Sequence, residues 1–204
     1  GGGDAYGCAI RDPDGAGGDG AELWCWGRNE VNQTGDPSRI VHSNPLRIGS
    51  EVGWTAVDGA DTHTCGLRQP EGSAEGAELW CWGKNDVGQL GTGDLVNATT
   101  PVRIGALTGW TQVSVAFQHT CGLRGDLLYC WGGNASGQLG DGTTTAQNSP
   151  QQVGAAGWSE VSAGGSYTCG RRGGELYCWG DSSSGQAGTG TVQQNSPTLV
   201  TGTG

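Results

Sequence analysis

Methionine is absent from the 204 residues, and so is any apolar run of 18 residues. A run of about that length is needed for a membrane-spanning helix, so the sequence predicts no membrane span. A basic and then apolar leader is also missing from the given residues, which therefore contain no signal peptide. Without a methionine, we expect the chain to be a processed product or an excerpt of a longer one.

Positive charge is scarce. Ten Lys and Arg stand against twenty Asp and Glu, which gives a net charge of −10. The longest basic run is Arg171-Arg172. Because nucleic acids and anionic membranes bind clusters of Lys and Arg, we expect neither as a partner.

Known catalytic and metal-binding motifs are missing as well. The sequence contains no H-E-x-x-H, G-x-S-x-G or P-loop pattern, and its cysteines are too far apart for the C-x₂₋₄-C spacing of zinc sites. His63 and His119 each precede Thr-Cys. This repeated position favours a structural role near a blade edge over metal ligation or base catalysis. We therefore predict no enzyme activity, no catalytic residue, no metal and no cofactor.

Eight cysteines are present, in four short segments. In "CGLRGDLLYC" a type II′ turn at Gly125-Asp126 would place Cys121 opposite Cys130. That pair is non-hydrogen-bonded, with Cα atoms only ~4.5 Å apart, at the short end of the disulfide range. The same register pairs Cys8 with Cys25, Cys65 with Cys81, and Cys169 with Cys178. Four hairpin disulfides indicate an oxidising compartment; the alternative is reduced, buried cysteines in a cytosolic chain.

Facing charges check this register. In three hairpins an arginine falls opposite a glutamate: Arg11 and Glu22, Arg68 and Glu78, Arg172 and Glu175. Two of the turns are expanded into the Gly-rich, acidic loops 12–21 and 69–77. Insertions at loop tips are tolerated, so the register of the strands is retained.

Tryptophans repeat along the chain. Four precede glycine at steps of 56, 49 and 48 residues: Trp26, Trp82, Trp131 and Trp179. Three more stand in "GWTAV", "GWTQV" and "GWSEV" before the later hairpins: Trp54, Trp110 and Trp158. Because strand alternation puts such residues on one face, we expect a structural core between packed sheets; a carbohydrate platform is the alternative.

Each unit of about 50 residues predicts four short strands, as in a β-propeller blade; a solenoid is the alternative. For the third unit these are 110–115, 118–124, 127–131 and 151–154. We predict an all-β, β-propeller-type array in a single domain, with blades at approximately 1–53, 54–109, 110–157 and 158–204.

The two ends of the array look unfinished. The first unit lacks the "GWTxV" strand, and the last stops after "SPTLVTG". We therefore expect an open arc or part of a larger propeller, with possible self-association through the terminal blades. A closed four-bladed ring is the alternative.

The stretch "HTCGLRGDLLYCWGGNASGQLGDGTTTAQNSPQQV" resembles the regulator of chromosome condensation repeat, with its Y-x-W-G-x-N-x-x-G-Q-L-G core. The resemblance extends over all four units, with His63 and His119 at the family's histidine position and Tyr6 and Tyr167 replacing it. It implies a β-propeller, commonly of seven blades. The founding members bind a small GTPase and chromatin, but their GTPase-contacting insertion has no match here. The cysteine pairs resemble those of extracellular-looking bacterial members.

Several loop motifs permit a functional and a structural interpretation. The tripeptide Arg124-Gly125-Asp126 is either an adhesion motif or simply a good turn. Asp94 and Asp141 are either calcium ligands or solvated turn residues. Three asparagines begin glycosylation sequons: Asn32, Asn97 and Asn134.

Function is predicted by class only. The first hypothesis is a non-enzymatic, secreted or cell-surface interaction module that binds a protein or glycan through loops 12–21, 69–77 and 141–149. The second is a structural subunit of an extracellular assembly or filament. The third, by family analogy alone, is an exchange factor for a small GTPase.

Overall fold

The computed structural model describes residues 2, 5–13, 15 and 20–202, which form four antiparallel sheets, here called blades 1 to 4. Blade 1 contains β1 (Tyr6–Arg11), β2 (Glu22–Gly27) and β3 (His42–Val52). Blade 2 contains β4 (Trp54–Ala60), β5 (His63–Arg68), β6 (Glu78–Gly83) and β7 (Ala98–Arg103). Blade 3 contains β8 (Trp110–Val115), β9 (His119–Arg124), β10 (Leu127–Gly132) and β11 (Gln147–Gln152). Blade 4 contains β12 (Trp158–Ala163), β13 (Tyr167–Arg172), β14 (Glu175–Gly180) and β15 (Gln194–Leu199).

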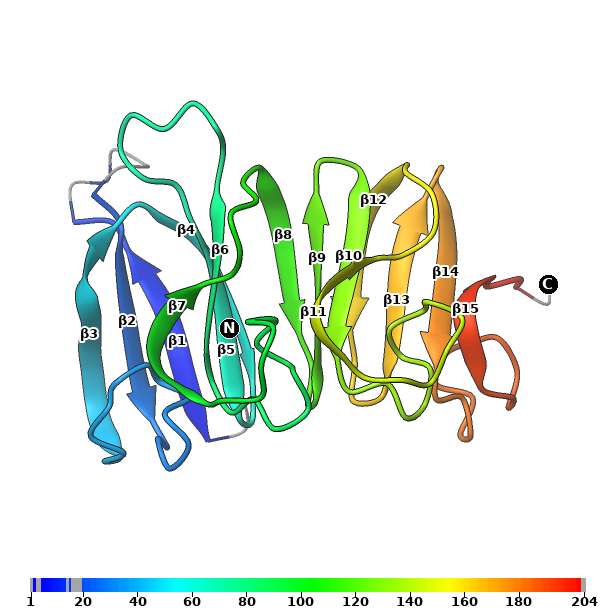
Figure 1. The fold of residues 1–204 in the computed structure, drawn as a ribbon, viewed down its shortest axis with the longest axis horizontal. Helices are drawn as coiled ribbons and strands as arrows, with labels where there is room; N and C mark the ends of the chain where they lie inside the picture. Colours follow the sequence, from blue (N-terminus) through cyan, green and yellow to red (C-terminus); the bar gives the residue numbers. More distant parts are fainter. Residues whose placement is uncertain (1, 3–4, 14, 16–19, 203–204) are drawn as a thin grey trace.

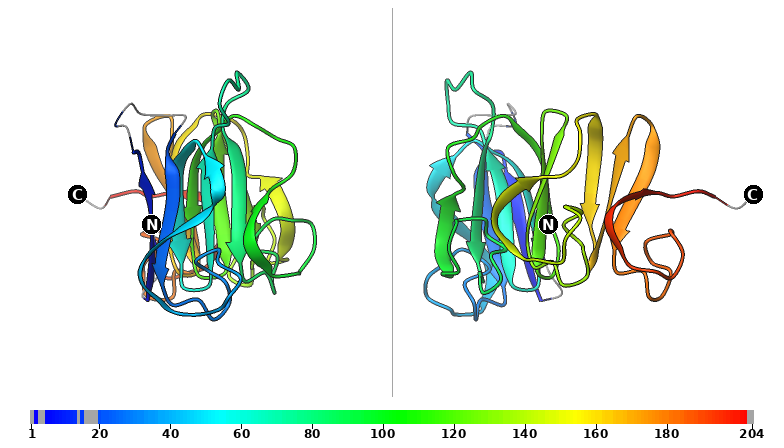
Figure 2. Two further views of the ribbon diagram at one scale, coloured as in Figure 1. Left: turned by 90° about the vertical axis from the view of Figure 1, so that its left-hand side faces the viewer. Right: turned by 45° about the vertical axis from the view of Figure 1, so that its right-hand side comes forward.

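The blades stand side by side in a row, with blade 1 at one end and blade 4 at the other (Figure 1, Figure 2). At each junction a hairpin strand of one blade contacts the first strand of the next blade: β1 contacts β4, β5 contacts β8, and β9 contacts β12. The predicted all-β, propeller-type array is confirmed, and it is open. The alternative of a closed four-bladed ring is wrong for the described residues, because blades 1 and 4 lie at opposite ends.

The four hairpins have the register that the sequence predicts. Cys121 is opposite Cys130, and a disulfide joins them with Cα atoms 4.1 Å apart. Gly125 has a φ of +60°, while Asp126 does not have a positive φ, as a type II′ turn requires. The other three hairpins carry Cys8–Cys25, Cys65–Cys81 and Cys169–Cys178.

The outer strand of blade 3 departs from the prediction. It was expected at 151–154, but β11 spans Gln147–Gln152, and Val153 follows it as a buried residue. The sequence of β11 is "QNSPQQ", with Pro150 inside the strand. Proline lacks an N–H donor and is tolerated on an edge strand. The residues of this edge strand do not alternate between apolar and polar. The prediction was therefore placed around the apolar Val153, beyond the end of the strand.

Tryptophans fill the spaces between the blades. Trp82, Trp131 and Trp179 are fully buried. A tryptophan on the first strand of each complete blade meets them edge to face, with ring centroids about 6 Å apart: Trp54, Trp110 and Trp158. Edge-to-face contacts of this kind stabilise an aromatic core beyond simple burial.

Trp26 differs from its three counterparts. It was expected to be largely buried, but it is only half-buried. The physical reason is that Trp26 lines the open hollow of blade 1, whereas Trp82 donates a hydrogen bond to the Gln33 carbonyl of the preceding blade and Trp179 donates one to that of Gln138.

Polar contacts also link the blades. His63 Nε2 lies 2.8 Å from Thr120 Oγ1 of the next blade, and His119 Nε2 lies 2.8 Å from Thr168 Oγ1. In blade 1, Tyr6 takes the histidine position and its hydroxyl lies 2.7 Å from Thr64 Oγ1. These threonines in turn donate to a glutamine carbonyl of the preceding blade: Thr64 to Gln33, Thr120 to Gln89, and Thr168 to Gln138. The contacts therefore repeat at each junction between blades.

Candidate interaction surfaces

The histidines are part of the blade junctions and are not exposed at a blade edge. Burial lowers the pKa of both His63 and His119 to about 3, and for His63 the charge of His119 adds to this. The two Nδ1 atoms are buried without a hydrogen-bond partner among the described residues. A neutral, enclosed imidazole cannot reach a substrate, so the structural interpretation fits these residues. Groups of His, Cys, Asp and Glu that could hold a metal ion do not occur in the described part of the chain.

The three loops expected to select partners lie on two different edges. Loop 69–77 connects β5 and β6 at the hairpin-tip edge, the upper edge in Figure 1. The end of β1 and the start of β2, which loop 12–21 connects, lie at the same edge. Loop 141–149 leads from β10 into β11 at the opposite edge. Loops 12–21 and 69–77 therefore share one edge of the array, and loop 141–149 lies on the other. Part of loop 12–21 lies outside the described residues.

Loop 69–77 is held at both ends and exposed at its tip. The Gln69 N–H donates to the Gly53 carbonyl, and the Ala77 carbonyl accepts the Trp110 N–H from blade 3. Between these anchors Glu71 and Glu75 are exposed to solvent. Anchored ends and an exposed acidic tip give a loop of defined position that presents negative charge.

The Arg-Gly-Asp tripeptide is only partly displayed. The Arg124 Nε donates to the Thr108 carbonyl at 2.6 Å, and the Asp126 carbonyl accepts the N–H groups of Gly157 and Trp158. Arg124 therefore fastens the hairpin to the connection between blades 2 and 3. This engagement favours the interpretation of the tripeptide as a turn.

The two aspartates considered for calcium have partners within their own loops. Asp94 Oδ1 accepts hydrogen bonds from the Thr92 hydroxyl at 2.6 Å and from the Val96 N–H. The Thr92 hydrogen bond is the main reason why the pKa of the Asp94 carboxyl lies below its usual value. Asp141 Oδ1 accepts from the N–H and hydroxyl of Thr143. These carboxylates close turns, as Asp commonly does.

The three sequon asparagines differ in exposure. Asn32 and Asn134 are buried, and their amide nitrogens donate to carbonyl groups of their own loops. Asn97 is exposed, and its Oδ1 accepts the N–H of Asn85. Only Asn97 of the three is open to a modifying enzyme.

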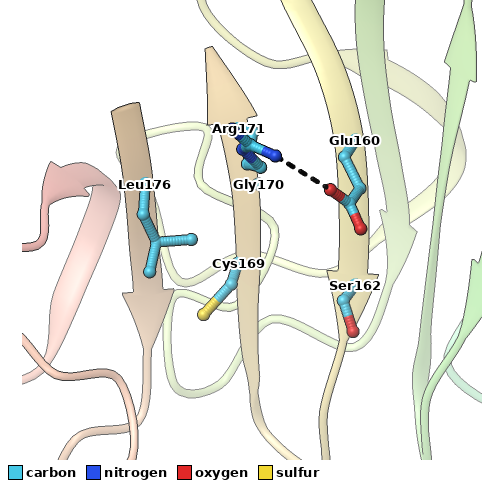
Figure 3. Close-up of a pocket in the computed structure, with 6 residues that line it drawn as sticks. All are labelled: Glu160, Ser162, Cys169, Gly170, Arg171 and Leu176. Atoms are coloured by element: carbon cyan, nitrogen blue, oxygen red, sulfur yellow. Dashed lines mark ion pairs between the residues drawn. The ribbon is translucent and has the colours of Figure 1, made fainter. Parts of the chain in front are cut away.

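The two end faces of the array are unlike. On blade 1 a hollow of about 390 Å³ is lined by Ala9, Arg11, Trp24, Trp26 and Pro45. On blade 4 a hollow of about 250 Å³ is lined by Glu160, Ser162, Cys169, Gly170, Arg171 and Leu176. Figure 3 shows these residues on β12, β13 and β14, with Arg171 and Glu160 forming an ion pair at 4.0 Å.

Sequence reasoning missed two residues on these faces. Arg171 stands where blades 2 and 3 have the buried Leu67 and Leu123, and Ala9 stands where they have glycine at 66 and 122. The signal was available in the repeats, as "CAIR", "CGLR", "CGLR" and "CGRR". The sequence shows these two substitutions, but their importance depends on which face of the blade each residue occupies.

Solved structures of similar shape place the chain in the class of β-propeller repeat proteins. Human WBSCR16 matches with a TM-score of 0.82 and 20% identity, over 98% of this chain and 52% of WBSCR16. Prp20p of Saccharomyces cerevisiae matches with a TM-score of 0.78 and 20% identity, over 98% of this chain and 49% of Prp20p. The ectodomain of the receptor kinase CR4 of Physcomitrella patens matches with a TM-score of 0.53 and 21% identity, over 88% of this chain and 40% of the ectodomain. The chain thus spans about half the length of these structures, or less.

The repeat itself is also identified. Residues 77–123 and 126–170 match the family model for the regulator of chromosome condensation (RCC1) repeat, so the chain contains RCC1 repeats. Each matched segment begins just before the third strand of one blade and ends in the second strand of the next. The sequence repeat therefore joins two blades covalently. The described residues contain no helix that is both long and apolar enough to cross a membrane.

Proposed function

We propose that the chain is a non-enzymatic module that binds another protein through the expanded hairpin tips of blades 1 and 2. The observation that carries the proposal is the contrast between blades. Blades 3 and 4 close their hairpins with the two-residue turns 125–126 and 173–174, whereas blades 1 and 2 extend theirs into loops 12–21 and 69–77 at the same edge. Loops at the edge of a rigid scaffold are common sites of recognition.

The charge of these loops indicates the kind of partner. Every charged residue within the two loops is acidic: Asp12, Asp14, Asp19, Glu71 and Glu75. A partner with a basic surface fits this composition, and such binding weakens as salt is added. Prp20p is described by its binding to Gsp1p and histones, which supports protein binding as a use of this fold.

An extracellular or cell-surface location is part of the proposal. Four disulfides support it, since disulfides persist in oxidising compartments. A similar fold in the ectodomain of CR4 shows that this architecture occurs in a receptor. The exchange-factor alternative rests on family likeness alone.

A role as a structural subunit is the second candidate, favoured by the half-buried Trp26 on the end face of blade 1. The charged pair Arg171–Glu160 on the other end face argues against simple end-to-end stacking. A soluble, monodisperse particle at high concentration supports the binding module, and a polymer supports the structural subunit.

The binding proposal is tested with a panel of secreted and cell-surface proteins. The wild-type chain is compared with a variant in which 69–77 is replaced by the Gly-Asp turn of blade 3, and with the pair Glu71→Gln and Glu75→Gln. The matched control replaces Gly125-Asp126 with Asn-Gly, another good two-residue turn. We expect a partner that binds wild type and control but loses binding to both loop variants. Binding that is indifferent to loop 69–77 contradicts the proposal.

A further inference from the structure

The segment between β2 and β3 of blade 1 contains two residues with an unusual backbone conformation. Asn32 has a φ of +63° and Arg39 a φ of +57°, and they are the only non-glycine residues with a positive φ in the described part of the chain. The other blades have glycine at the position of Asn32: Gly88, Gly137 and Gly185. Glycine adopts a positive φ without steric cost, so an asparagine at this position indicates a use for its side chain.

The side chains of Asn29 and Asn32 meet on one backbone carbonyl. Asn29 Nδ2 donates a hydrogen bond to the carbonyl oxygen of Asp36 at 2.8 Å, and Asn32 Nδ2 donates one at 2.9 Å. Both asparagines are fully buried. Arg39 Nε donates to Asn32 Oδ1 at 3.1 Å. The N–H of Thr34 donates to Asn29 Oδ1, also at 3.1 Å. Both amides are therefore fixed with their NH₂ groups toward the carbonyl.

This carbonyl belongs to an Asp-Pro peptide bond, Asp36–Pro37. An ionised aspartate can attack its own carbonyl carbon through a five-membered ring, and carboxylates are established nucleophiles. Proline is the most favourable leaving group because its tertiary amide nitrogen is more basic than that of other residues. Two preorganised donors on a carbonyl oxygen stabilise the oxyanion that such an attack forms. The other blades have glycine at the position of Pro37: Gly93, Gly142 and Gly190.

The carboxylate of Asp36 is held in place by its neighbours. Its Oδ2 accepts hydrogen bonds from the hydroxyl and the N–H of Ser38, and it lies 2.9 Å from His42 Nε2. Burial acts to raise the pKa of the Asp36 carboxyl, but the hydrogen bonds of Ser38 and His42 outweigh it, and the pKa lies below its usual value. All of these contacts are made by Oδ2, so the attacking atom is Oδ1.

We propose that the chain cleaves itself at the Asp36–Pro37 bond. Asp36 Oδ1 bonds to the carbonyl carbon of the same residue, and Asn29 and Asn32 hold the resulting oxyanion. The bond from this carbon to the Pro37 nitrogen then breaks, the nitrogen takes a proton from water, and a cyclic anhydride remains at Asp36. Water opens the anhydride to two carboxyl groups. The sum is hydrolysis of one peptide bond by one water molecule, in a single event without turnover of a substrate.

The fold keeps the two products together. β3, which follows the bond, pairs with β2, which precedes it. The disulfide Cys8–Cys25 lies before the bond and the other three lie after it, so no disulfide joins residues 1–36 to residues 37–204. The cleaved chain should therefore remain a folded array and separate into two fragments only when it is unfolded.

Intact-mass spectrometry of the purified, oxidised chain under denaturing conditions tests the proposal. The chain is first kept for several days at room temperature and about pH 6, where aspartate is ionised. We expect one fragment that ends at Asp36 and one that begins at Pro37. Asp12–Pro13, the same dipeptide at the other edge of blade 1, is an internal control that should stay intact. Added hydroxylamine should trap the anhydride as a hydroxamate at Asp36.

Three variants identify the groups responsible. Asn32→Gly restores the glycine of the other blades and removes one donor from the carbonyl. It should fold normally, because glycine suits the positive φ, yet cleave about a hundredfold more slowly. Pro37→Ala should abolish cleavage. The matched control Asn44→Gly, at an exposed position of β3, should cleave at the wild-type rate.

Four results overturn the inference: no fragment ends at Asp36, Asp12–Pro13 is cleaved as fast as Asp36–Pro37, folded Asn32→Gly cleaves at the wild-type rate, or cleavage persists in Pro37→Ala. The last result would assign the cleavage to a contaminating protease. None of these outcomes depends on loop 69–77, so they leave the test of the proposed function unaffected.

Discussion

The end faces of blades 1 and 4 differ in the residues that they expose. At the end formed by blade 1, the aromatic residues of the repeat are kept, and Trp24 and Trp26 remain half-buried. At the end formed by blade 4, Leu176 is 45% exposed while its counterparts are fully buried, and beside it the repeat's leucine has become Arg171. The comparison teaches that the two end faces differ in chemistry, since blade 1 presents tryptophan rings and blade 4 presents the ion pair of Arg171 and Glu160.

The largest expected effect separates an internal junction from the end of blade 1. Trp131→Ala should reduce the free energy of unfolding by about 3–5 kcal/mol, because it empties a fully buried site. Trp26→Ala should cost clearly less, because the ring is only half-buried. Urea unfolding of the oxidised chain measures both. Equal losses would mean that Trp26 is covered in solution.

Acid should weaken the internal junctions through their histidines. The pKa of His63 and His119 is about 3 in the folded chain and about 6.5 in the unfolded chain, so the unfolded chain binds more protons between these values. Stability should be complete above pH 6.5 and fall by about 1.4 kcal/mol per pH unit for each histidine as the pH drops toward 3.

The control for this effect is the double variant His63→Gln and His119→Gln. Glutamine can donate a hydrogen bond to the threonine but does not titrate. The free energy of unfolding should therefore depend less on pH between 6.5 and 3, by the contribution of the two histidines. If wild type and double variant show the same pH dependence in urea unfolding, the histidines are not buried as neutral groups.

The junction between blades 1 and 2 should tolerate only a small residue at position 59, unlike the equivalent positions of the later junctions. A Cβ at Gly59 would lie against the Tyr6 hydroxyl. The same repeat position is Val115 in blade 3, which follows His63, and Ala163 in blade 4, which follows His119. Gly59→Val should therefore cost about 1–3 kcal/mol through overpacking. Adding Tyr6→His should restore much of the loss, since it recreates the combination of residues that blades 2 and 3 have at these positions, His63 and Val115. Two costs that simply add in thermal unfolding would refute this coupling.

The smallest effect is expected at the end of blade 4. Arg171→Leu should change the free energy of unfolding by no more than about 0.5 kcal/mol, because the residue is exposed. It should also increase self-association in analytical ultracentrifugation, since it restores an apolar face. A loss well above 1 kcal/mol would show that Arg171 is buried against another surface.

Local pairing could be predicted from the sequence because it depends on short spacings. The cysteine hairpins, the facing pairs such as Arg68 with Glu78, and the missing first strand of blade 1 all follow from the comparison of repeats. The outer strand β11 was misplaced because an edge strand such as "QNSPQQ" carries no apolar alternation.

Contacts between blades could not be predicted, because they join residues about 50 positions apart on faces that only the packed array defines. The bond from His63 to Thr120 is one example, and the exposure of Trp26 is another. The candidate surfaces were predicted in part. Loops 12–21 and 69–77 fall on one edge, but loop 141–149 falls on the other, since strand direction decides the edge.

Hydrogen exchange tests the central claim that β1 lies at the edge of its sheet, whereas β5, β9 and β13, its counterparts in the other blades, lie inside theirs. The measurement compares the amides of Tyr6–Arg11 with those of His63–Arg68, His119–Arg124 and Tyr167–Arg172 by mass spectrometry, in the oxidised chain at concentrations where it is monomeric. The account predicts that Tyr6–Arg11 exchanges much faster, because β1 is paired on one side and the other three strands on both. Equal protection of all four strands would contradict it.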